Sequence, residues 1–137
     1  MTNLFPSDKA LVPFVSVDHM MKLIHHIGLR DMLKGIAAYI EDDFKRWESF
    51  DKTPRIGSHT DDGVMELMPT SDGQDYGFKY VNCHPKNVNE GLQTVVAFGL
   101  LADVSSGYPV LLTEMTLLTA LRTAATSATV AKLLAPK

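Results

Sequence analysis

The first fifty residues show two stretches with the 3.6-residue periodicity of amphipathic helices. A short apolar run at residues 11–15 predicts a strand before them. Ser16 can cap a first helix over residues 16–27, and Gly28 can end it. In residues 29–50 apolar side chains recur every three or four positions, with charged ones on the opposite side, which predicts one long helix. Its apolar positions are Leu29, Leu33, Ile36, Ile40, Phe44 and Trp47.

After Pro54 the pattern changes to short segments that are typical of strands. They cover residues 55–60, 63–69, 76–83, 94–104 and 108–112. The turn-forming triplets Asp61-Asp62-Gly63, Ser71-Asp72-Gly73 and Ser105-Ser106-Gly107 separate them. An antiparallel meander is the simplest arrangement.

The last segment, residues 116–134, predicts a helix rich in small side chains, which allow close packing against a neighbour. Helices at both ends of a run of strands predict an α+β fold. In this fold a largely antiparallel sheet has helices packed on one face.

Composition narrows the classes of protein to consider. With 137 residues, 45% of them hydrophobic, we expect one globular domain. The net charge of -3 and the scattered Lys and Arg residues argue against nucleic acid or an anionic membrane as partner. Charged residues interrupt every apolar run before the ~20 residues of a membrane span. The single cysteine, Cys83, and the absence of a signal-like N-terminus favour a cytoplasmic location.

Several kinds of site are absent from the sequence. A dinucleotide-binding loop needs glycines two and three residues apart, but the closest pair, Gly73 and Gly77, is four apart. The five histidines fit no metal-ligand spacing, so we expect no metal site. Cys83 and His84 are neighbours on a strand and face opposite sides, so they form no catalytic dyad, and Cys83 is interpreted as structural.

Isolated charges in apolar elements are more informative. Arg122 lies in the middle of the last predicted helix among leucine and alanine residues. A guanidinium group in such a place pairs with a carboxylate of the protein or binds an anionic ligand. For this residue alone, the pattern favours the structural ion pair.

Strand alternation places further charges together. Glu66 shares a strand face with Val64 and Met68, while Lys79 shares one with Gly77 and Val81. If the strands are adjacent, Glu66 and Lys79 could project into one cavity near Arg55. The alternative is that this face of the sheet is simply solvated, and the pattern alone favours that alternative.

Three polar residues are weaker candidates. Thr94, Thr123 and Asn82 could hydrogen-bond a ligand, but such side chains more often cap the backbone.

Four ordered phrases in the sequence resemble the ornithine cyclodeaminase/mu-crystallin family. They are DDFKRWESFDKTPRIGSH, ELMP, FKYVNCHPKN and ADVSSGYPVLLTEMTLLTALRTAATS, which extend from about Asp42 to Ser127. Cys83 departs from the pattern, because the resemblance leads us to expect glycine in an NGHP-like phrase.

The resemblance implies NAD-dependent conversion of L-ornithine to L-proline and ammonia. It assigns Arg55, Lys79 and Arg122 to the substrate carboxylate. Glu66, the other catalytic candidate besides Lys79, would lie near the reacting amine. Thr94, Arg122 and Thr123 would contact the cofactor, NAD.

The resemblance also implies an organisation in two parts. Residues 1–115 would form a substrate-binding and dimerisation domain that pairs through its sheet into a homodimer. Residues 116–137 would form a helix leading to a NAD-binding domain that this sequence lacks, so we expect the chain alone to be inactive. Alternatives are a ketimine reductase, an alanine dehydrogenase or a non-catalytic dimerisation module.

Overall fold

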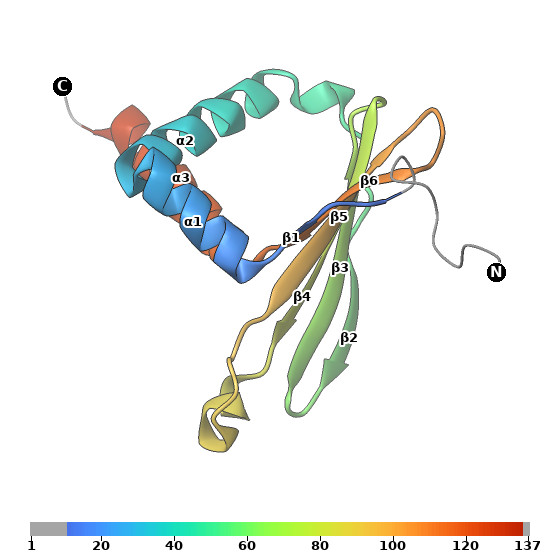
Figure 1. The fold of residues 1–137 in the computed structure, drawn as a ribbon, viewed down its shortest axis with the longest axis vertical. Helices are drawn as coiled ribbons and strands as arrows, with labels where there is room; N and C mark the ends of the chain where they lie inside the picture. Colours follow the sequence, from blue (N-terminus) through green and yellow to red (C-terminus); the bar gives the residue numbers. More distant parts are fainter. Residues whose placement is uncertain (1–10, 136–137) are drawn as a thin grey trace, which may run out of the picture.

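The computed structural model describes residues 11–135, which form one sheet with helices gathered on one side (Figure 1). In chain order its elements are β1 (Phe14–Val15), α1 (Val17–Ile27), α2 (Leu29–Lys45), η2 (Trp47–Ser49), β2 (Ile56–Thr60), β3 (Gly63–Ser71), β4 (Asp75–Cys83), η3 (Pro85–Glu90), β5 (Ala97–Asp103), β6 (Pro109–Glu114) and α3 (Thr116–Leu134). This arrangement confirms the predicted α+β class.

The sheet has the strand order β1-β6-β5-β4-β3-β2. Strands β2 to β6 form the expected antiparallel meander. The short β1 pairs with β6 in parallel, with Phe14 opposite Leu112, so the sheet is mixed at this edge. Strand β5 begins at Ala97 rather than at residue 94, because the side chain of Asn82 accepts a hydrogen bond from the Val96 N–H at 2.6 Å.

Local signals explain where the first helix begins and ends. The Ser16 hydroxyl accepts a hydrogen bond from the backbone N–H of His19 at 3.3 Å, and the His19 ring accepts one from the N–H of Ser16. Gly28 follows with φ at 86°, a value that glycine adopts readily, and its N–H donates to Ile24. The predicted boundary at Gly28 is therefore confirmed.

The second helix is shorter than predicted. Helix α2 ends at Lys45, not at residue 50, and Trp47–Ser49 form a 3-10 turn. Arg46 ends the helix, pairing with Asp43 at 2.9 Å and with Asp72 at 2.8 Å. Its guanidinium also lies over the ring of Phe50. Because Asp72 lies in the β3–β4 turn, this pair attaches the end of α2 to the sheet.

The helices form a layer of their own beside the sheet. Helices α2 and α3 pack against each other, and the buried residues of α3 are the small Ala125 and Thr129. The β4–β5 connection, which contains η3, projects from the opposite end of the sheet, away from the helices (Figure 1). Within residues 11–135, no helix is long and apolar enough to cross a membrane.

The interior of the described residues is small. Its buried hydrophobic side chains are Met20, Ala97, Ala102 and Ala125. Larger apolar side chains line one face of the sheet instead, which we call the outer face, and each of them is at least 40% exposed. They are Phe14, Ile56, Leu67, Tyr76 and Phe98. The sheet therefore presents an apolar surface that residues 11–135 leave uncovered.

Candidate functional site

The other face of the sheet, which we call the site face, carries the predicted charges. Glu66 lies opposite Gly57 on one side and Val81 on the other, and Lys79 lies opposite Met68 and Gly99. Paired residues share a face, so Glu66 and Lys79 are diagonal neighbours on one surface. The alternative of a solvated face is wrong, because only 17% of the Glu66 side chain is exposed and Lys79 is half-buried.

Arg55 and Glu66 form the ion pair of the site. Nη1 of Arg55 donates to both carboxylate oxygens, at 3.2 Å and 3.3 Å. The Arg55 side chain is 62% exposed, so it covers the more buried carboxylate from the solvent side. The residue directly precedes β2, which explains why the turn from Pro54 brings it to this face.

Lys79 lies among other cations. Burial, together with the positive charges of Arg122 and Arg55, lowers the pKa of Lys79 below its ordinary value of 10.5, and Glu66 acts in the opposite direction. Arg55 and Arg122 therefore both act electrostatically on Lys79, although the three cations lie in separate parts of the chain.

Arg122 has no partner of the kind that the pattern favoured. Within residues 11–135 neither Arg122 nor Lys79 forms an ion pair, so the expectation of a structural pair for Arg122 is wrong. The residue is exposed and lines a recess of about 250 Å³ between α2 and α3, beside Trp47 and Asp43. Asp43 pairs with Arg46 instead. Two unpaired cations therefore border the site face.

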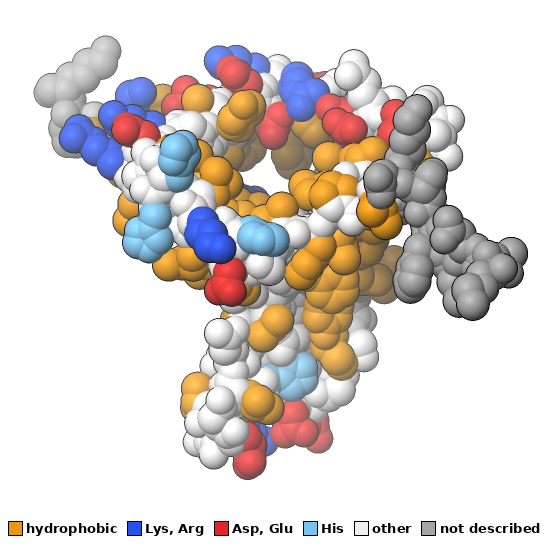
Figure 2. Space-filling view, viewed as in Figure 1, with side chains coloured by type: hydrophobic (Ala, Val, Ile, Leu, Met, Phe, Trp, Pro, Cys, Tyr) orange, Lys and Arg blue, Asp and Glu red, His pale blue; other side chains and the backbone are white. Residues whose placement is uncertain are grey.

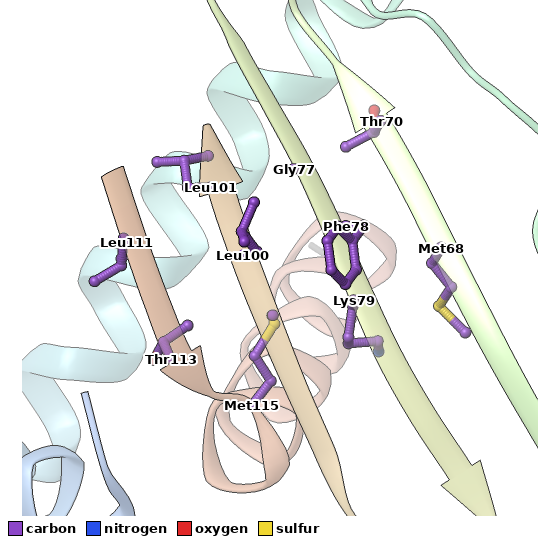
Figure 3. A pocket seen from close by; sticks show the side chains of 11 residues that line it. Met68, Thr70, Gly77, Phe78, Lys79, Leu100, Leu101, Leu111, Thr113 and Met115 are labelled. Carbon is purple, nitrogen blue, oxygen red and sulfur yellow. The ribbon is translucent and has the colours of Figure 1, made fainter. Parts of the chain in front are cut away.

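A pocket of about 300 Å³ adjoins Lys79. Its lining comes from four neighbouring strands and from Met115, which directly precedes α3, and is mainly apolar (Figure 3). Met68 and Met115 lie on either side of Lys79 in this view. In the space-filling view a hollow with hydrophobic side chains around it separates the helices from the sheet (Figure 2). The site is thus an open chamber with apolar walls and a cationic rim.

Glycine residues create this space beside Lys79. Gly77 precedes it by two residues on β4, and Gly99 is its cross-strand partner on β5. A Cβ at Gly99 would overlap Sδ of Met115 and would lie 3.1 Å from the Phe78 carbonyl oxygen. The sequence reasoning missed Gly99 and Met115, since nothing in the linear pattern shows which side chain packs over a glycine on another strand.

The remaining candidates lie apart from the pocket. The hydroxyl of Thr123 donates to the Thr119 carbonyl at 2.8 Å, and the Thr94 carbonyl accepts from the His84 N–H at 2.9 Å. Asn82 supports the β4–β5 connection through Val96. Cys83 is a half-buried free thiol. The described residues hold no cluster of His, Cys, Asp or Glu that suits a metal ion.

Comparison with known proteins shows the family to which a chain with this sequence belongs. Residues 17–137 match the sequence profile of the ornithine cyclodeaminase/mu-crystallin family. The chain belongs to this family. An ornithine cyclodeaminase of Brucella abortus biovar 1 (strain 9-941) is 71% identical over 127 residues, which make up 93% of this chain and 35% of the relative. This chain therefore spans about a third of the length of such relatives.

Solved structures of related enzymes share the fold. A lysine cyclodeaminase, described for its recognition of L-lysine, L-ornithine and L-2,4-diaminobutyric acid, aligns with a TM-score of 0.84 at 26% identity, covering 91% of this chain and 39% of that one. An archaeal alanine dehydrogenase dimer with bound NAD aligns with a TM-score of 0.76 at 25% identity, covering 91% and 38%. The likeness extends to enzymes that act on different amino acids.

Proposed function

We propose that this chain is the substrate-binding and dimerisation part of an NAD-dependent ornithine cyclodeaminase, which converts L-ornithine to L-proline and ammonia. One observation carries the proposal: among residues 11–135, Lys79 and Arg122 form no ion pair with a carboxylate, and Lys79 feels the charges of Arg122, Arg55 and Glu66. The relative from Brucella and the lysine cyclodeaminase support ornithine as the substrate.

The cations would hold the α-carboxylate of the amino acid. Like charges that are partly removed from water repel one another, and an anion bound between them relieves that repulsion. Arg55 and Arg122 can each present a planar fork of N–H donors to a carboxylate, while Lys79 adds a point charge. Held at three points, the α-carbon is fixed in position, and fixed geometry lowers the barrier to reaction.

Glu66 would act on the amine. The proposed chemistry requires an ammonium group to lose a proton before its lone pair can attack an imine carbon. The Glu66 carboxylate is half-buried, lies on the same face as Lys79, and can accept that proton. Arg55 bonds it in the absence of substrate, so substrate carboxylate and Glu66 would share the Arg55 guanidinium.

The described residues would supply only some of the contacts that NAD needs. Arg122 is unpaired and exposed and Thr123 follows it on α3, so both can contact a cofactor that approaches this helix. Thr94 would make a further contact. A glycine-rich pyrophosphate loop is not part of this sequence. When bound, NAD would accept hydride from the substrate α-carbon and return it to the cyclic imine.

The organisation of the chain is part of the proposal. Residues 1–115 would form the substrate-binding and dimerisation domain, and residues 116–137 would connect it to the part that binds NAD. The exposed outer face would pair with the same face of a second chain, because monomers seldom expose so much apolar surface. A cytoplasmic location is supported by the single, free Cys83.

A chimera tests the proposal. This chain replaces the matching 127 residues of the Brucella relative, and release of proline and ammonia is measured with ornithine, and turnover with alanine. We expect turnover of ornithine, and an Arg122→Ala loss of about 100-fold in kcat/KM, from one charged hydrogen bond of about 3 kcal/mol. Arg30→Ala, an exposed arginine of α2, is the matched control.

The outcomes separate the alternatives within the family. Turnover of alanine but not of ornithine would identify an alanine dehydrogenase. Full activity of the Arg122→Ala chimera would contradict the carboxylate clamp.

A further inference from the structure

His59 lies on the site face, although the sequence reasoning gave it no role. It is the fourth residue of β2, two positions after Gly57, and alternate residues of a strand share a face. Gly57 lies directly opposite Glu66. The His59 side chain therefore projects on the side of the sheet that carries the carboxylate.

Gly57 allows the imidazole and the carboxylate to come close. A Cβ at Gly57 would lie 3.1 Å from Nε2 of His59 and 3.6 Å from Cγ of Glu66. Both side chains thus border the space above the same glycine, and Nε2 is the ring atom nearest to it. A bridging water molecule or a rotation of the Glu66 side chain can connect two polar groups that border one space.

Glu66 and His59 differ in their exposure to solvent. Glu66 is covered by Arg55, and its side chain is only 17% exposed. His59 is exposed on the edge strand of the sheet. The imidazole is therefore open to solvent, whereas the carboxylate on the same face is mostly covered.

The arginine side chains of the site are not suited to carry protons, whereas histidine is. Arg55 just before β2, Lys79 on β4 and Arg122 on α3 are the cations of this site, and guanidinium groups do not exchange protons near neutral pH. Imidazole is the side chain that gains and loses a proton most readily in that range. His59 is therefore suited to proton exchange on this face.

We propose that His59 relays protons between the Glu66 carboxyl group and solvent. The inference rests on the proposed function, in which Glu66 takes a proton from the reacting ammonium group. The Glu66 carboxyl then gives that proton to Nε2 of His59, while Nδ1 gives its own proton to water. The nitrogen that leaves as ammonia takes a proton back from solvent. Only N–H and O–H bonds change, so the overall reaction remains balanced.

His59→Asn in the chimera described above tests the relay. The substitution removes the exchanging ring but keeps a polar side chain on an exposed edge strand. We expect kcat for ornithine to fall about tenfold, with KM changed less than about twofold, because His59 acts through Glu66 and not on the substrate. Added imidazole should restore kcat in proportion to its concentration. The pH dependence of kcat should also differ from that of the parent chimera.

The matched control is His26→Asn, which removes an exposed imidazole from the last turn of α1 instead of from the sheet. Its kcat and its response to imidazole should equal those of the parent. An unchanged kcat in His59→Asn would overturn the relay, as would a loss that imidazole does not restore and that accompanies a lower melting temperature. A parent chimera that fails to convert ornithine would instead refute the proposed function, before any variant is compared.

Discussion

Lys79 shows how a binding residue can cost stability. Its ammonium group is half-buried and faces Arg122 and Arg55, and both effects lower its pKa below 10.5. A group whose charged form is disfavoured in the fold destabilises the protein while it is protonated. The same repulsion favours any anion that binds there, so stability and affinity are opposed at this residue.

Replacing Lys79 should therefore stabilise the free chain. Between the lowered pKa of Lys79 and 10.5 the unfolded chain holds the proton more tightly, so the free energy of unfolding rises with pH through this window. Lys79→Gln should remove that rise and should add about 0.5 kcal/mol at neutral pH, a modest gain because the site is partly exposed. Urea unfolding at several pH values measures both effects.

Lys22→Gln on α1 serves as the control, because Lys22 is exposed and does not contribute to the pKa shift of Lys79. A loss of stability in Lys79→Gln at neutral pH would show that the lysine contributes favourable contacts that outweigh the repulsion.

Single residues were predicted well where strand alternation alone decides their placement. Glu66 and Lys79 were assigned to strand faces from period-two spacing, and the register puts them together. The partner of Arg122 was not predictable, because the choice between a carboxylate and an open position depends on how α3 lies against α2. His59 and Gly57 were missed for a related reason: their importance comes from the strand opposite them.

At the scale of elements, the junction between the sheet and α3 sets the geometry of the site. The N–H of Ala97 donates to Oγ1 of Thr116 at 2.9 Å, and the N–H of Met115 donates to the Ala97 carbonyl at 2.9 Å. Met115 also packs over Gly99. These contacts attach the first turn of α3 to β5, and therefore determine where Arg122 lies relative to Lys79.

Gly99→Ala should disturb this junction. The added methyl group would overlap the Met115 sulfur and crowd the Phe78 carbonyl, and overpacking of this kind costs about 2 kcal/mol in the free energy of unfolding. Gly35→Ala provides the opposite control, because Gly35 lies within α2 with open space around it and should gain up to about 1 kcal/mol. Chemical denaturation of both variants checks the two signs. Equal stability in Gly99→Ala and the parent would show that Met115 moves aside freely.

Element boundaries were the less predictable part of the fold. The apolar period continues through Phe44 and Trp47, so the sequence favoured a helix to residue 50. Arg46 ends it at Lys45 through its pair with Asp72, which lies 26 positions away in the chain. Likewise residues 94–96 fitted a strand pattern, but the Asn82 side chain accepts the hydrogen bond of the Val96 N–H there. Both differences come from contacts between distant segments.

For the whole molecule, the distribution of apolar side chains matters most. Among residues 11–135 few of them are buried, and the outer face exposes a row of them that crosses the strands. Leu67→Glu or Phe98→Glu would place a charge in the centre of that row. If the proposed dimer forms there, each change should raise the dimer Kd at least tenfold, on the order of 2 kcal/mol.

Sedimentation velocity over a range of concentrations measures this effect. Tyr39→Glu is the matched control, because Tyr39 is 76% exposed on α2, in the helix layer on the other side of the sheet. A dimer that persists in Leu67→Glu and Phe98→Glu, or one that Tyr39→Glu disrupts, would place the interface elsewhere.

The small interior has a consequence for how this chain responds to its surroundings. When few side chains are buried within a protomer, much of the free energy of unfolding comes from whatever covers its surface, and each partner adds a contribution that grows with its own concentration. Melting temperature then ceases to be a fixed property of the polypeptide. It becomes a function of dilution, of ligand supply and of the molecules with which the protein is mixed.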